Sequence, residues 1–109
     1  MHFELDDKYL EVRAQARAFA DAIEDIAAEA DEMSEVHPGV LGALRDSGLS
    51  GLMVPAEYGG RFERVDPLAI CLAREAIMAT SAHADSLFAL QGIGSFAITL
   101  AGSEEQRRR

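Results

Sequence analysis

Apolar side chains recur at alternating spacings of four and three over the first 30 residues of this chain. The residues that share this spacing are Leu5, Tyr9, Val12, Ala16, Phe19, Ile23, Ile26 and Ala30. Such a period places them along one face of an α-helix, with charged residues around the rest of its surface. The sequence therefore predicts one long amphipathic helix that begins after Asp6, its expected N-cap, and fades near residues 31–34.

Two shorter helices are predicted in the middle of the chain. The first begins at Pro38 and ends at Gly48, a residue that readily adopts the left-handed conformation of a helix end. The second begins at Pro67, which follows the expected N-cap Asp66, and runs to about Thr80. The apolar residues of the first are Val40, Leu41 and Leu44. Those of the second are Leu68, Leu72, Ala76 and Ala79 on one side, with Ile70, Ala73 and Ile77 adjoining them.

The last long helix is expected over residues 82–101. Between Ala84 and Ala101 its only formal charge is Asp85, and a helix that is apolar almost all round is normally buried on most sides. We therefore expect it inside the bundle or beneath a further domain. Together these segments predict an all-α fold, a helical bundle of about four main helices.

Charge and length exclude several kinds of partner. The 109 residues suit one domain, and most of the net charge of −9 falls on the first 35 residues, the opposite of what nucleic-acid phosphates require. The start of the chain is polar and acidic, unlike a signal peptide. The weakly charged run 86–101 is shorter and more polar than the stretch of about 20 apolar residues that crosses a bilayer. We expect no nucleic-acid partner, no membrane span and a cytoplasmic location.

The residues that could carry chemistry form no complete catalytic or metal-binding pattern. The histidines at positions 2, 37 and 83 lack the glutamate three residues earlier that a di-iron bundle uses, and we expect each at a surface or an interface. Cys71 is the single cysteine, so it can form no internal disulfide, and it is expected to be a buried structural thiol. Glu57 is expected to be a solvated carboxylate in its turn.

Two phrases of the sequence carry a family resemblance. Residues 48–60 read GLSGLMVPAEYGG, an apolar run that Pro55 interrupts and two glycines close, and they predict a compact loop between helices. Residues 101–106 read AGSEEQ, in which Ser103 and Gln106 form the capping-box pattern of a new helix. In this order and spacing the two phrases resemble the N-terminal helical domain of the acyl-CoA dehydrogenases, and the resemblance covers nearly the whole chain.

The resemblance implies part of an FAD-dependent enzyme that oxidises an acyl-CoA thioester at its α and β carbons. In this family a middle β-domain and a C-terminal helical domain follow, FAD lies mainly between those two, and the complete enzyme is usually a homo-oligomer. The catalytic base is typically a glutamate of the C-terminal domain. The resemblance therefore implies no catalytic or cofactor-binding residue within positions 1–109, and a chain that is inactive alone. Because a helix begins near Ser103 and the sequence ends at Arg109, we expect the domain 1–109 to be cut at the start of that helix.

The resemblance also implies a candidate substrate site. In relatives, the helix before the Gly-Ser-Glu-Glu phrase lines the far end of the acyl pocket. Candidate substrate-binding residues, spaced by three and four on one side of that helix, are Asp85, Phe88, Ala89, Gly92 and Phe96. The alternative is that all five only pack helices together. If they do line a pocket, Ala89 and Gly92 leave room for a long or bulky acyl chain.

Other interpretations of the function stay open at the level of sequence. The chain could be a free-standing, non-catalytic helical interaction module, or one chain of a split flavoenzyme whose partner supplies the other two domains. Within the enzyme class, an acyl-CoA oxidase or a flavin monooxygenase of the same architecture is compatible with these residues.

Overall fold

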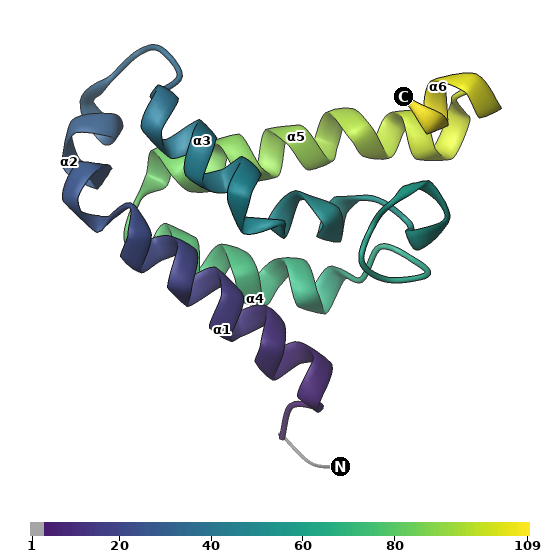
Figure 1. Ribbon diagram of the computed structural model, residues 1–109, viewed down its shortest axis with the longest axis horizontal. Helices are drawn as coiled ribbons and strands as arrows, with labels where there is room; N and C mark the ends of the chain where they lie inside the picture. The colour runs from purple at the N-terminus through teal and green to yellow at the C-terminus, as the bar shows by residue number, and fades with distance from the viewer. Residues whose placement is uncertain (1–3) are drawn as a thin grey trace.

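Six α-helices and two 3-10 segments make up the fold in the computed structural model, which describes residues 4–109 (Figure 1). In chain order they are α1 (Asp7–Ala22), α2 (Glu24–Glu32), α3 (Pro38–Ser47), η1 (Leu49–Met53), η2 (Ala56–Tyr58), α4 (Pro67–Met78), α5 (Ala82–Ala101) and α6 (Glu104–Arg108). Within residues 4–109 the only β-type pairing is an isolated bridge between Pro55 and Phe62. The predicted all-α class is confirmed.

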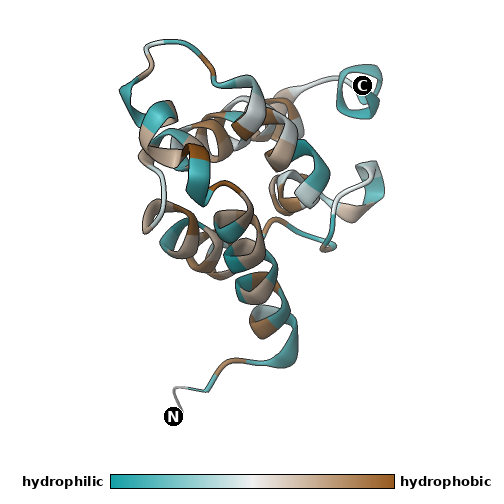
Figure 2. Cartoon of the chain, turned by 60° about the vertical axis from the view of Figure 1, so that its left-hand side comes forward, coloured by the Kyte–Doolittle hydropathy of each residue, from teal (hydrophilic) through white to brown (hydrophobic). Residues whose placement is uncertain are grey.

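The predicted first helix is two helices, α1 and α2, with a break at Ile23. The backbone there (φ −105°, ψ 3°) leaves the helical range. The Ile26 N–H donates a hydrogen bond to the carbonyl oxygen of Ile23, three residues earlier, at 3.1 Å. Ile23 is fully buried, and after the break α2 contacts α5. The single-helix prediction was wrong because neither proline nor glycine marks the break and the apolar spacing continues through it. Alternating hydrophilic and hydrophobic turns of α1 are visible in Figure 2.

Helices α1 and α4 lie side by side and form the most extensive helix pair of the fold (Figure 1). The core face of α4 consists of Ala69, Ala73 and Ile77, which are almost completely buried. Leu68, on the neighbouring apolar side, is 44% exposed. The sequence predicted both apolar sides of α4 but not which of them is buried; the side with small alanines allows the closest approach of α1.

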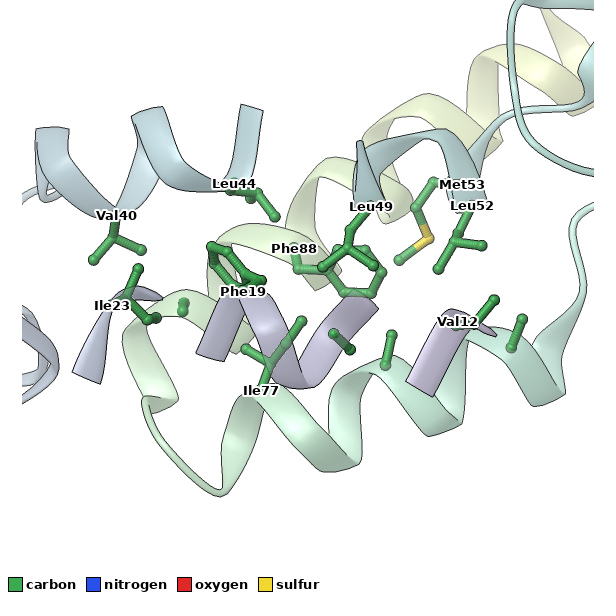
Figure 3. Close-up of a cluster of buried hydrophobic side chains, with 14 of the residues drawn as sticks. Val12, Phe19, Ile23, Val40, Leu44, Leu49, Leu52, Met53, Ile77 and Phe88 are labelled. Atoms are coloured by element: carbon green, nitrogen blue, oxygen red, sulfur yellow. The ribbon is translucent and has the colours of Figure 1, made fainter. Parts of the chain in front are cut away.

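The hydrophobic core lies where α1, α3, η1, α4 and α5 meet (Figure 3). Phe19 of α1, Leu49 of η1 and Phe88 of α5 converge at its centre, each at most 3% exposed. Val40 and Leu44 of α3 project toward Ile23 and Phe19, respectively (Figure 3). The N-terminal half of α5 is therefore a core element.

The predicted helix ends are largely confirmed. Gly48 ends α3 in the left-handed conformation (φ 75°), and Asp66 accepts a hydrogen bond from a backbone N–H of α4 at 3.0 Å. Ser103 and Gln106 form the capping box that begins α6, with hydrogen bonds of 2.8 and 3.2 Å. Asp6 stands at the N-cap position of α1 but forms no side-chain cap bond, which differs from the expectation.

The segment between α3 and α4 is a compact loop, as predicted, and it is held against α1. Gly59 has φ 94°, a conformation that side chains disfavour, and a Cβ at Gly60 would overlap the Val54 carbonyl oxygen. The side-chain amide of Gln15 on α1 accepts a hydrogen bond from the Arg61 guanidinium of the loop. The loop conformation is therefore set by its own glycines and by α1.

The outer half of α5 (residues 90–101) extends beyond the bundle. Leu90, Ile93 and Leu100 are 63%, 68% and 67% exposed, and Phe96 and Ile98 are also above 40%. Of the two expected positions, inside the bundle or beneath a further domain, the first is wrong for this half. At its end, the Tyr58 hydroxyl donates to Glu104 Oε2 at 3.0 Å and holds α6 against η2.

Candidate functional site

An apolar groove runs between α4 and α5 and has a volume of about 390 Å³. Met53 lies at one wall, Val65 and Pro67 lie at the start of α4, and Arg74 lies farther along α4. The remaining lining residues are Ile70 and Cys71 from α4 and Ala89, Gly92, Ile93 and Phe96 from α5. The groove is thus mainly apolar with one cationic side chain, a composition common to small-molecule sites.

Three of the five candidate substrate-binding residues line this groove. Ala89 is half-buried, Gly92 is buried and Phe96 is 42% exposed. Phe88 lies on the core side of α5, fully buried beside Phe19 (Figure 3). Asp85 lies one turn before Ala89 and reaches the groove only through its partner Arg74. The geometry thus separates a packing residue, Phe88, from residues that a ligand in the groove would touch.

Met53 occupies the space that Gly92 leaves open. A Cβ placed on Gly92 would overlap the Met53 sulfur and would lie 2.7 Å from Met53 Cε. The missing side chain therefore accommodates η1 rather than leaving empty volume. Sequence reasoning missed Met53 because its place in the groove depends on how η1 folds back on α5. Methionine is flexible, so its side chain can shift to change the size of the groove.

A bidentate ion pair joins the two walls of the groove. Arg74 Nε and Nη2 donate to Asp85 Oδ1 and Oδ2 at 2.9 and 2.8 Å. Asp85 is 6% exposed, and its carboxylate, by accepting these hydrogen bonds, raises the pKa of Arg74. The pair links α4 to α5 and places one charged group, the Arg74 guanidinium, in the lining of the groove.

Cys71 departs from its expected burial, because its side chain is exposed and lines the groove. It stands on the side of α4 that faces away from the Ala69–Ala73 core positions. Glu57 is exposed, as expected for a solvated turn residue.

His37 is the N-cap of α3, and His83 lies where the start of α5 meets the start of α3. His37 is buried and its Nδ1 accepts hydrogen bonds from the backbone N–H groups of Gly39 and Val40 at 3.0 and 3.3 Å. His83 Nε2 accepts a hydrogen bond from the His37 backbone N–H at 3.0 Å. His2 lies outside the described residues. Residues 4–109 contain no group of three or more side chains arranged to hold a metal ion.

The groove does not fit a flavin cofactor. FAD carries a pyrophosphate that needs cationic side chains or free backbone N–H donors. The single cationic group among the lining residues, Arg74, is already paired with Asp85, and the other lining residues are apolar or carry a thiol. These residues therefore hold no flavin, and no step of catalysis is assigned to them.

By length and composition alone, α5 could cross a membrane, which differs from the expectation for residues 86–101. The helix begins four residues before that run and is 20 residues long. Core helices satisfy the same criterion, and the N-terminal half of α5 is committed to the core through Ala84, Asp85 and Phe88. The composition of α5 is therefore weak support for a membrane span.

Comparisons of this sequence with a family model and with curated proteins point to the same family. The family model described as "Acyl-CoA dehydrogenase, N-terminal domain" matches residues 6–109. A probable acyl-CoA dehydrogenase of Mycobacterium leprae is 33% identical over 108 residues, which cover 98% of this chain and 27% of that protein. The cyclohexane-1-carbonyl-CoA dehydrogenase of Syntrophus aciditrophicus is 31% identical over 102 residues, 94% of this chain and 26% of that protein. No solved structure matches significantly.

The helical fold and the matched residues define an N-terminal domain of the acyl-CoA dehydrogenase type. The chain belongs to the acyl-CoA dehydrogenase family. It spans about a quarter of the length of the relatives it matches.

Proposed function

We propose that this chain is the N-terminal domain of an FAD-dependent acyl-CoA dehydrogenase, and that its α4–α5 groove is part of the wall that receives the acyl chain. The observation that carries the proposal is the apolar groove itself, which gathers Ala89, Gly92 and Phe96 on a helix whose outer half is uncovered. An acyl chain is a flexible hydrocarbon, and it gains free energy when it leaves water for such a surface.

In this proposal the chain shapes the pocket for the acyl chain and contributes no catalytic group. Ala89 and Ile93 set the width of the groove, Phe96 lies toward its outer end, and Met53 adjusts the depth beside Gly92. The Arg74–Asp85 pair holds α4 and α5 together beside the groove. The base that removes the α-proton and the flavin that accepts the hydride are supplied by the middle and C-terminal domains of the complete enzyme.

The experiment uses the complete enzyme and a series of acyl-CoA thioesters from short to long chains, together with cyclohexane-1-carbonyl-CoA. Ala89→Phe fills the groove, so we expect kcat/KM for long or bulky acyl groups to fall by about 10- to 100-fold, while that for short groups changes little. Ala89 is a better probe than Gly92, because any side chain at Gly92 displaces Met53.

The matched control is Ser86→Phe, which adds the same ring to the same helix at an exposed position that does not line the groove. We expect its chain-length profile to equal that of the unaltered enzyme. A profile that is unchanged by Ala89→Phe, or changed equally by both substitutions, would contradict the acyl-pocket role.

The same proposal includes FAD as the cofactor of the complete enzyme, a homo-oligomeric assembly and a cytoplasmic location. It also requires that the reading frame continue past Arg109 into a β-rich domain and a helical domain that carries the base. A stop codon there, with no neighbouring gene for those domains, would instead favour a free-standing helical module.

A further inference from the structure

We propose that His37 and His83 form a proton-sensitive joint, which holds the start of α3 against the start of α5 only while both imidazoles are neutral. This inference does not depend on the proposed enzyme function. It rests on the hydrogen bonds around two side chains that the acyl groove does not use.

The geometry assigns one tautomer to each ring. The backbone N–H groups of Gly39 and Val40 can only donate, and both point at His37 Nδ1, at 3.0 and 3.3 Å. Nδ1 must therefore carry a free lone pair, and the ring proton of His37 lies on Nε2. The His37 backbone N–H likewise donates to His83 Nε2 at 3.0 Å, which places the ring proton of His83 on Nδ1.

A second proton on either ring would replace an acceptor by a donor. Protonated His37 would direct an N–H at the two backbone N–H groups that it now caps. Protonated His83 would direct an N–H at the His37 amide. Both rings also lie at the N-terminal ends of helices, α3 and α5, where the helix dipole disfavours added positive charge.

The His37 ring cannot easily turn away from this conflict. Its Cε1 and Ile26 Cδ1 of α2 both lie beside Gly39, each 3.0 Å from the position that a Gly39 Cβ would take. His37 is 9% exposed. A second proton therefore removes the cap of α3 and the hydrogen bond between His37 and His83, and the first turn of α3 opens.

Two carboxylates of α2 face the joint and oppose this effect. Glu29 Oε2 lies 3.7 Å from His37 Nε2, and Asp31 accepts hydrogen bonds from the backbone N–H of His83 and from the Ser81 hydroxyl at 3.0 and 2.7 Å. The Glu29 side chain is 71% exposed, so its attraction for a charged ring is screened. Asp31 is occupied by donors of α5 and holds the backbone of His83. Neither carboxylate removes the donor–donor conflict at His37 Nδ1 or His83 Nε2.

The first test determines the tautomers directly. Long-range proton–nitrogen NMR spectra distinguish Nδ1–H from Nε2–H in each imidazole. The 109-residue chain carries His2→Gln, so that only the two rings of the joint report. At about pH 8 we expect Nε2–H for His37 and Nδ1–H for His83. The opposite tautomer at either ring would overturn the proposal.

The second test measures the opening of the first turn of α3. Hydrogen-exchange protection of the Gly39 and Val40 amides, corrected for the intrinsic pH dependence of exchange, should fall at least about tenfold between pH 7.5 and 5.5, because each additional proton bound by the open state contributes up to tenfold per pH unit. Carboxylates change charge mainly below this range. The comparison variant, His37→Asn with His83→Gln, keeps acceptors at both places without titrating there, and its protection should be independent of pH over this range. An equal loss of protection in both proteins, or no loss in the original, would overturn the proposal.

Discussion

At some glycine positions of this fold a side chain would clash with neighbouring atoms, and at others it would not. Gly60 lies against the Val54 carbonyl and Gly92 lies against the Met53 side chain, whereas a Cβ on Gly42 would have no neighbour within 4 Å. The sequence shows all of these as glycine and does not distinguish them. Only the folded positions of the loop and of η1 reveal which ones are required.

The glycine positions support a matched pair of stability predictions. Gly60→Ala places a methyl group on a backbone oxygen that cannot rotate away, so we expect it to lower the free energy of unfolding by about 3 kcal/mol. Gly42→Ala introduces the same methyl group into open space within α3 and should raise it by about 0.5–1 kcal/mol. Urea denaturation of both variants measures the difference. Equal effects would show that the loop conformation is not fixed as described.

A second residue-scale prediction concerns the ion pair behind the groove. Asp85→Asn leaves Arg74 without its charged partner, and we expect the free energy of unfolding to fall by about 1–3 kcal/mol. The Arg74 side chain is 48% exposed, so water can solvate the unpaired charge and the effect is moderate. A double-mutant cycle with Arg74→Met, followed by chemical denaturation, isolates the coupling. Additive effects of the two substitutions would mean that the bidentate geometry contributes nothing to stability.

At the scale of elements, local sequence signals predicted most helix ends, and neighbouring helices determined the rest. Pro38, Gly48 and Pro67 act on their own backbone, so their effects could be predicted from the sequence. The break at Ile23 and the buried face of α4 depend on contacts with α5 and α1. The same holds for the candidate site. The spacing on α5 predicted which of its residues share a side, but Met53 of η1 and Arg74 of α4 come from other elements and could not be predicted from that spacing.

The start of α5 offers a prediction on pH at this scale. Asp31 of α2 caps α5 from outside that helix, and the Ser81 hydroxyl and the His83 backbone N–H hold the pKa of its carboxyl below the ordinary value of 3.8. A lowered native pKa means that the stabilisation is fully present above pH 3.8 and is lost as the pH falls through the native value. Asp31→Ala should therefore cost about 1 kcal/mol near pH 7, and much less once the carboxyl is protonated.

Denaturation curves from neutral pH down to about pH 3 test this expectation. The neighbouring exposed acid, Glu32, provides the control, since Glu32→Ala removes a charge of the same sign without removing the cap. If both variants show the same pH dependence, the Asp31 cap does not stabilise α5 in the way described.

The whole molecule is a small bundle with an uncovered apolar surface, the outer half of α5. This surface comprises Leu90, Ile93, Phe96, Ile98 and Leu100. A monomer in water seldom leaves so many large apolar side chains on one helix without a partner. The sequence predicted the fold of the bundle and an apolar surface left for a further domain. It did not predict which α5 side chains form that surface, because this depends on how α5 packs on the bundle.

Self-association of the 109-residue chain follows from this surface. We expect its sedimentation coefficient to rise with protein concentration, and the substitutions Leu90→Gln and Ile93→Gln together to suppress that rise. Both side chains are more than 60% exposed, so replacing them removes little buried contact from the bundle. The control is Val36→Gln, an exposed aliphatic residue between α2 and α3, which should leave the concentration dependence unchanged. A chain that stays monomeric at all concentrations would contradict this prediction.

The central claim is that the outer half of α5 is an internal surface of a larger acyl-CoA dehydrogenase. Hydroxyl-radical footprinting of side chains tests it most directly, comparing the dilute 109-residue chain with the complete enzyme. The account predicts strong labelling of Leu90, Ile93 and Leu100 in the short chain and protection of all three in the complete enzyme, with Val36 labelled in both. Equal labelling of the three α5 side chains in the two proteins would contradict it.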